Sequence, residues 1–264
     1  MKRTSQNSDN HPASQLAALL QALPASPSAR EIHRLRVSIK RTRAWLKLCH
    51  AVTDSTPSYP QLVTSLRDLS HALSAQRDRD VAVQTLTKLV ARYPGKKTQH
   101  LGDVLSQLIA QDLDSPPDIT SLDSCIAQIR ELLPTFTCLA LPRQPQVAVI
   151  ERRFAKMCKA GERALGSATC MDLHAWRKRV KTLFYQVEMV ADALPGQNRI
   201  QLRLDKLGRC LGKIHDLCVL EAMLEDKLAL LQPPLTATPV FKRIRRERHR
   251  LIAFCYKHYH RLCT

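Results

Sequence analysis

Apolar residues recur along most of this chain at spacings of three and four positions, which is the period of a helix with one buried face. The clearest example spans residues 172–189, where Leu173, Trp176, Val180, Leu183 and Val187 form a single apolar seam. No segment shows the strict alternation that is typical of a half-buried strand. The pattern therefore predicts an all-α protein.

Proline, glycine and capping residues divide this pattern into separate helices. Ser28-Ala-Arg-Glu31 has the form of a capping box, so we expect a helix to begin there and to continue to about Val52. The other apolar runs predict helices at about residues 14–23, 61–92, 97–112, 119–133, 147–166, 170–194, 197–231 and 238–263. Residues 1–13 are expected to be disordered, Thr53–Pro60 to form a loop, and Leu141–Pro145 to mark a boundary.

Two segments of the chain resemble each other. Residues 31–48 read EIHRLRVSIKRTRAWLKL and residues 172–189 read DLHAWRKRVKTLFYQVEM, and both contain His-x-x-Arg-x-x-x-Lys. Each precedes a helix with Leu-x-x-Leu-x-x-x-Leu and then a basic residue and an aspartate. These follow-on residues are Leu66, Leu69, Leu73, Arg77 and Asp78 in the first copy, and Leu204, Leu207, Leu211, His215 and Asp216 in the second. The repeat predicts two homologous halves, residues 14–141 and 142–264.

Each repeated helix carries a row of cations beside its apolar seam. At about 100° per residue, one face collects His33, Arg36, Lys40, Arg43 and Lys47, and another collects His174, Arg177, Lys178 and Lys181. Two later helices show the same feature, with Arg152, Arg153, Lys156, Lys159 and Arg163 on one, and Lys242, Arg245, Arg246 and His249 on the other. A solvated helix usually mixes acids into such a face for pairing. Either carboxylates from elsewhere in the protein or an external polyanion must therefore offset the repulsion.

The net charge of the chain also indicates an anionic partner. The chain holds 41 Lys and Arg residues against 23 Asp and Glu residues, a formal charge of +18, and 24 of those cations but only 11 of those acids follow residue 140. So basic a balance indicates a nucleic acid, an anionic membrane surface or a phosphate polymer as partner, with a merely soluble basic surface as the plain alternative. The second half is expected to dominate anion attraction.

The nine cysteines include no Cys-x-x-Cys pair, and several lie in apolar helical patterns, at Cys49, Cys158, Cys210, Cys218 and Cys255. We interpret most of them as buried thiols in a reducing compartment. The sequence shows no signal peptide and no membrane span, so the cytoplasm is the expected location.

Catalytic and metal-binding motifs are not evident in the sequence. It contains no phosphate-cradling glycine loop, no HExxH and no nucleophile elbow, and the His and Cys residues near the C-terminus lack zinc-site spacing. We therefore expect a protein without enzymatic activity, cofactor or metal.

The duplicated His-x-x-Arg-x-x-x-Lys helices, each followed by the leucine pattern and an aspartate, resemble the CHAD family of histidine-containing α-helical domains. His33-Arg-Leu-Arg-Val37 and Arg77-Asp-Arg-Asp-Val81 carry the resemblance most clearly, and it extends over residues 14–264. It implies two pseudo-symmetric antiparallel four-helix bundles around a basic central groove that binds inorganic polyphosphate. It also implies that Arg41 joins the binding residues of the first half. The second copy departs from the family pattern at Phe184, where a cation is expected.

We therefore expect polyphosphate binding, and association with polyphosphate granules, at a cleft lined by His33, Arg36, Lys40, Arg41, Arg43, Arg152, Arg153, Lys156, His174, Arg177, Lys178, Lys181, Lys242, Arg245, Arg246 and His249. Binding of RNA or single-stranded DNA is the first alternative, but it calls for stacking platforms, and the chain has only two Trp, five Tyr and five Phe residues. A polyphosphate-processing enzyme is the second alternative. A membrane-surface role ranks last because the basic faces lack exposed aromatic anchors opposite them.

Overall fold

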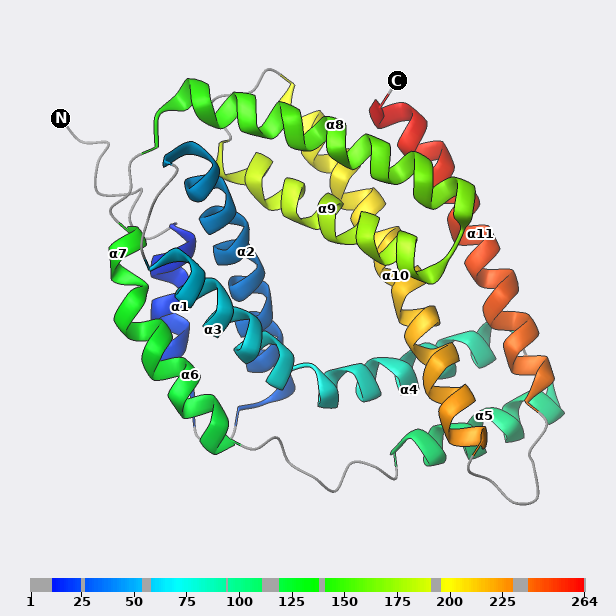
Figure 1. The fold of residues 1–264 in the computed structure, drawn as a ribbon. Coiled ribbons are helices and arrows are strands. Elements are labelled where there is room, and N and C mark those ends of the chain that lie inside the picture. Colours follow the sequence, from blue (N-terminus) through cyan, green and yellow to red (C-terminus); the bar gives the residue numbers. More distant parts are fainter. Residues whose placement is uncertain are drawn as a thin grey trace. The chain divides into compact units, whose positions relative to one another are not determined.

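The computed structural model describes residues 11–24, 27–53, 58–93, 95–110, 119–137, 141–190, 196–229 and 237–263. Its helices are α1 (Pro12–Gln21), α2 (Ala29–Thr53), α3 (Tyr59–Ala72), α4 (Ala75–Arg92), α5 (Lys96–Ala110), α6 (Ile119–Leu132), α7 (Pro134–Thr137), α8 (Arg143–Ser167), α9 (Cys170–Met189), α10 (Gln197–Ala229) and α11 (Thr238–Cys263) (Figure 1). No strand forms within these ranges, so the prediction of an all-α protein is confirmed.

The start of α2 shows how local sequence sets a helix boundary. The backbone N–H of Ser28 donates to Glu31 Oε2 at 2.7 Å, and the backbone N–H of Glu31 donates to Ser28 Oγ at 3.3 Å. These reciprocal bonds are those of the predicted capping box, because each side chain satisfies a backbone donor that the first helical turn leaves free. The helix begins at Ala29, directly after this serine.

The prediction of one continuous helix over residues 61–92 is wrong, because two helices, α3 and α4, occupy this region. At the break, both the backbone N–H and the hydroxyl of Ser74 donate to the carbonyl oxygen of His71, at 2.9 and 2.6 Å. A serine that bonds its own backbone in this way competes with the helical hydrogen-bond pattern.

Some predictions fall on parts of the chain that lie outside the described residues. They are the disorder of residues 1–10, residues 54–57 of the predicted loop, the predicted ends of three helices at 111–112, 191–194 and 230–231, and the side chain of Arg77. The prediction of disorder is wrong for Pro12 and Ala13, which belong to α1, and Tyr59 and Pro60 of the predicted loop belong to α3.

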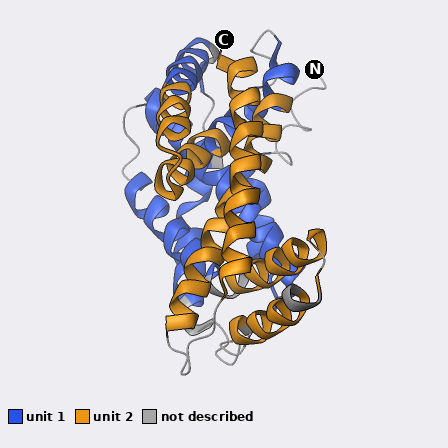
Figure 2. Ribbon diagram, turned by 90° about the vertical axis from the view of Figure 1, so that its right-hand side faces the viewer, with its two compact units in different colours: residues 1–74, 117–155, 182–201 blue, residues 75–116, 156–181, 202–264 orange. Residues whose placement is uncertain are grey.

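The chain divides into two compact units, which are coloured separately in Figure 2. The first contains Met1–Ser74, Pro117–Ala155 and Thr182–Gln201, and the second contains Ala75–Pro116, Lys156–Lys181 and Leu202–Thr264. Helices α8, α9 and α10 contribute residues to both units. The units are defined by contacts and the predicted halves by sequence repetition, so the boundary near residue 141 stays a prediction.

The first unit has a core formed by α1, α2, α3, α6 and α7, of which α3 and α6 pack along each other (Figure 1). Leu35 and Ile39 of α2 are buried in this core, together with leucines of α1 and α3. The Thr42 hydroxyl donates to the carbonyl oxygen of Pro12 at 3.0 Å and so ties α2 to the start of α1. The core covers one face of α2 and leaves its cationic row beside the apolar seam.

The second unit combines α4, α5 and α11 with parts of α8, α9 and α10. Trp176 of α9 is fully buried, and its indole N–H lies 3.4 Å from the sulfur of Met157 on α8. A Cβ atom at Gly161 would come within 2.8 Å of the Trp176 ring, so a residue without a side chain is needed where α8 meets this ring. This packing sets the rotation of α9 about its own axis.

Four cysteines form two disulfides within the second unit. Cys158 pairs with Cys263 and Cys170 pairs with Cys218, at Cα–Cα distances of 6.0 and 6.1 Å. The prediction of Cys158 and Cys218 as buried thiols is therefore wrong, because helix packing brings each beside a partner far away in sequence. The same prediction is confirmed for the remaining three, which are buried and free: Cys49, Cys210 and Cys255.

Across the described residues, no helix is long and apolar enough to cross a membrane.

Candidate functional site

The cationic row of α9 lies over two glycines of α10. A Cβ atom at Gly208 would lie 3.0 Å from Lys181 Cε, and one at Gly212 would lie 3.9 Å from Arg177 Nε. Because the two helices pair in antiparallel register, Arg177 meets Gly212 and Lys181 meets Gly208 one turn further along. The missing side chains on α10 leave room for these two long cationic side chains.

The next pair in this register is His174 with His215, whose Nδ1 atoms lie 3.1 Å apart. One of these nitrogens must donate and the other must accept, so the contact requires at least one neutral ring. Burial lowers the pKa of His174, and the charges of Lys178 and Arg177 lower it further. Burial and the neighbouring charges thus favour the neutral form of the His174 imidazole.

The Lys181 ammonium has a shared carboxylate partner. Its Nζ lies 4.0 Å from Asp205 Oδ1, while Arg209 contacts the other oxygen of Asp205 at 2.8 Å. Burial lowers the pKa of Lys181, with Asp205 opposing this shift and the charges of Arg177 and Arg209 adding to it. Lys178, which is exposed, makes no ion pair within the described residues. The carboxylate of Asp205 is therefore shared by two cations.

The glycines of α10 were missed in the sequence analysis, although a signal for them exists. In both copies of the repeat a small residue follows the second and third leucines, as Ser70 and Ser74 in the first and Gly208 and Gly212 in the second. In the first copy, Arg36 Nη1 donates to the carbonyl oxygen of Ser70 at 3.2 Å. In each copy, therefore, the arginine or lysine of the motif contacts a small residue of the following helix.

On α2 in the first unit, the predicted residues differ in exposure. His33 is exposed and, with Arg34 and Arg41, lines a hollow of about 740 Å³ beside α1. Arg36 is buried and Lys40 is half-buried. Arg41 has internal partners, because its Nη2 lies 3.0 Å from Glu188 Oε2 and its Nη1 donates to Gln15. The carboxylate of Glu188 therefore neutralises Arg41, which lies beside the first row.

A second group of cations in the first unit, Arg43, Arg152 and Arg153, lies near Tyr59. Arg153 Nη2 donates to the carbonyl oxygen of Lys47 at 2.7 Å. Burial lowers the pKa of Arg153, and burial together with the charge of Arg67 lowers that of Arg43. Within the described ranges, Arg43, Arg152 and Arg153 form no ion pair with an acid.

The cations of α11 are partly neutralised within the second unit. Arg245 and Arg248 both contact Glu221, and Arg246 lies over the ring of Tyr93, 5.8 Å from its centroid. Lys242 and His249 are exposed.

The predicted site residues thus fall into separate groups. Those in the first unit are His33, Arg36, Lys40, Arg41, Arg43, Arg152 and Arg153, and those in the second are Lys156, His174, Arg177, Lys178, Lys181, Lys242, Arg245, Arg246 and His249. Within the second unit, the α9 row packs on α10, while Lys156 lines a hollow between α8 and α9. In the described part of the chain, no group of three or more His, Cys, Asp or Glu residues has the arrangement of a metal site.

A comparison with family profiles matches the CHAD domain to residues 13–225. The match includes both His-x-x-Arg-x-x-x-Lys helices and the α10 glycines, and it ends before α11. No curated protein matches the chain. Since the match covers well over half of the sequence and includes the motif residues just described, the chain belongs to the CHAD domain family.

Proposed function

We propose that this protein binds inorganic polyphosphate, without enzymatic turnover, through the cationic rows of α2 and α9. One observation supports this most strongly: Arg177 and Lys181 occupy space left by Gly212 and Gly208, next to an aspartate, Asp205, that Lys181 shares with Arg209. Side chains placed in this way are held in position before a ligand arrives, which lowers the entropy lost on binding.

The chemistry of these side chains suits a chain of phosphates. An arginine donates forked hydrogen bonds to phosphate oxygens, and a lysine acts as a mobile point charge. His174 adds a group that is neutral in the free protein, and a bound phosphate would favour its charged form. The arginines around Tyr59, which form no ion pair with an acid within the described ranges, offer a further surface for the same polymer.

The proposal includes the finer features that the family resemblance implies. They are two pseudo-symmetric four-helix bundles and a basic groove shared by the cationic rows. The expected cytoplasmic location and the expected association with polyphosphate granules also belong to the proposal.

Nucleic-acid binding remains the alternative to be tested. Trp45 is 8% exposed and Trp176 is fully buried, so neither offers a face for base stacking. Phe254 and Tyr256 of α11 are exposed, and each contacts a histidine of its own helix. The bases of a nucleic acid should therefore add little to its affinity compared with a polymer of phosphates alone.

The deciding experiment is a titration of the protein with long-chain polyphosphate at several salt concentrations, with single-stranded DNA and tRNA as competitors. Polyphosphate should remain bound at equal phosphate concentration of either competitor, and displacement by them would refute the proposal. Release of phosphate in the presence of Mg²⁺ would instead support an enzyme.

A paired variant tests the site itself. Arg177→Ala with Lys181→Ala should weaken polyphosphate binding severalfold. The matched control is Lys206→Ala with Lys257→Ala, which removes two exposed cations of the same unit that make no ion pair in the described chain. Loss of helicity in the first variant would show that these two residues support the fold instead.

A further inference from the structure

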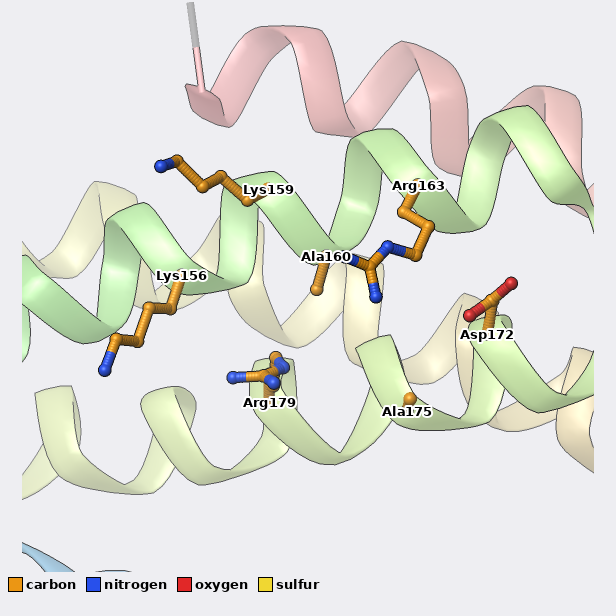
Figure 3. A pocket seen from close by; sticks show the side chains of 7 residues that line it. All are labelled: Lys156, Lys159, Ala160, Arg163, Asp172, Ala175 and Arg179. Carbon is orange, nitrogen blue, oxygen red and sulfur yellow. The ribbon is translucent and has the colours of Figure 1, made fainter.

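A second basic surface lies in the second unit, between α8 and α9. Its hollow of about 390 Å³ is lined by Lys156, Lys159, Ala160, Arg163, Asp172, Ala175 and Arg179. In Figure 3, Lys156 and Arg163 extend from α8 toward α9, which carries Arg179, while Lys159 points away from α9. Three cations from two helices therefore converge on one small space.

This hollow is separate from the cationic row of α9. Arg179 follows Arg177 by two residues, which places it about 200° further around the helix axis. The row that includes His174 and Lys181 faces α10, whereas Arg179 faces α8. One helix thus presents cations to two different surfaces.

The floor of the hollow is made by small side chains. Ala160 follows Lys156 by one turn and precedes Arg163 by one turn, and Ala175 precedes Arg179 by one turn. In Figure 3, Ala160 lies between Lys156 and Arg163 on α8, and Ala175 lies between Arg179 and Asp172 on α9. Since larger residues at these two positions would fill the space, the alanines keep it open.

The charge of the hollow is not balanced internally. Lys156, Lys159, Arg163 and Arg179 are all exposed, and none forms an ion pair with an acid of the described chain. Asp172 accepts hydrogen bonds from the hydroxyls of Ser167 and Thr169, which lower its pKa together with a weaker effect of Arg163. Asp172 is thus a charged carboxylate at one end of the hollow, and it leaves the end near Lys156 and Arg179 uncompensated.

We propose that this hollow is a second anion site, which binds a compact inorganic oligophosphate of two or three phosphate units, independently of the α9 row. Its volume lies at the small end of the range for ligand pockets, about 300–1,000 Å³. Its lining holds no aromatic ring and no large apolar side chain, so it offers nothing to a nucleobase. A nucleoside triphosphate is recognised there only through its phosphates.

Isothermal titration calorimetry with inorganic tripolyphosphate tests this site. A second titration uses ATP, and both titrations are carried out without Mg²⁺. Lys156→Gln with Arg179→Gln should weaken tripolyphosphate binding about five- to tenfold, as the loss of two charge pairings at an exposed site implies. The control, Lys206→Gln with Lys257→Gln, removes the same net charge around His258 and should have little effect.

A variant that leaves the net charge unchanged distinguishes binding in the hollow from attraction by the overall positive charge of the surface. Ala175→Leu keeps a good helix former at an exposed position and fills the floor, so it should also weaken tripolyphosphate binding. ATP should bind as tightly as tripolyphosphate, whereas much tighter binding of ATP would contradict recognition through phosphates alone.

The result for this site is distinguishable from that for the α9 row. The variant with both Arg177→Ala and Lys181→Ala should bind long-chain polyphosphate severalfold more weakly but keep its affinity for tripolyphosphate, and Ala175→Leu should show the reverse. The inference is overturned if tripolyphosphate does not bind the wild-type protein, if both paired Gln variants weaken it equally, or if only the α9 variant loses it. None of these outcomes by itself decides whether polyphosphate binds the α9 row.

Discussion

Replacement of Gly208 by alanine should stabilise the protein and weaken its binding of polyphosphate. In the interior of α10, the change from glycine to alanine favours the helix by about 0.5–1 kcal/mol. The new Cβ atom would lie 3.0 Å from Lys181 Cε, 3.2 Å from Nζ and 3.3 Å from Cδ. These atoms form the flexible end of the lysine, so it moves by a few tenths of an ångström at little cost to folding.

Gly212→Ala is the matched control. It lies one turn further along α10, gains the same helix propensity, and its Cβ atom would make an ordinary contact at 3.9 Å with Arg177 Nε. Both variants should therefore raise Tm, by about 2–4 °C for 1 kcal/mol in a chain of this size.

Only Gly208→Ala should affect the ligand. Displacement of one charge pairing is worth about 0.5–1 kcal/mol, which corresponds to a two- to fivefold weaker Kd for polyphosphate. Differential scanning calorimetry and a polyphosphate titration at fixed salt measure the two effects. Equal polyphosphate affinity of the two variants, with both folds stabilised, would refute the role of Lys181.

Three further predictions concern pH, salt and the disulfides. Because the pKa of His174 is lowered in the folded protein, the contribution of this residue to stability is full above pH 6.5, the pKa of the free side chain, and is lost as pH falls. His174→Gln should therefore lose less stability than wild type when both are unfolded by heat at low pH. Polyphosphate binding should take up protons near pH 6.5, which a binding enthalpy that depends on the buffer would reveal. In a plot of log affinity against log salt concentration, the variant with both Arg177→Ala and Lys181→Ala should have a slope smaller in magnitude by about 1.4–1.8 than wild type, since each of the two lost phosphate contacts removes about 0.7–0.9. An unchanged slope would exclude these two residues from the site. Cys263→Ser should lower the free energy of unfolding by about 2–4 kcal/mol under oxidising conditions, because the Cys158–Cys263 bond joins residues 105 apart. Dithiothreitol, which reduces this bond in the wild-type protein, should abolish the difference between the two proteins.

The disulfides also bear on where the protein works. Disulfides persist in oxidising compartments and are rare in the cytosol, whereas the sequence analysis placed this chain in the cytoplasm. Counting free thiols in the protein isolated without reductant tests both statements. Retention of Cys158 and Cys170 as free thiols would support the cytoplasmic location, and their oxidation would argue against it.

The sequence by itself determined the features that depend on neighbours along the chain. Helical periodicity set the fold class, the capping box at Ser28 set the start of α2, and an advance of about 100° per residue placed His174, Arg177 and Lys181 on one face. The repeated motif was enough to indicate the CHAD family, which the family match confirms. Such local rules need no knowledge of what the helix packs against.

Only the tertiary structure decided which distant groups meet. Arg41 and Glu188 form an ion pair although most of the chain separates them, and α10 supplies the carboxylate that Arg245 and Arg248 share. The hollow between α8 and α9 likewise depends on how two helices align their alanines. Sequence periodicity predicts that a face is buried but not which partner covers it, because helix register and rotation are set by side-chain packing between elements.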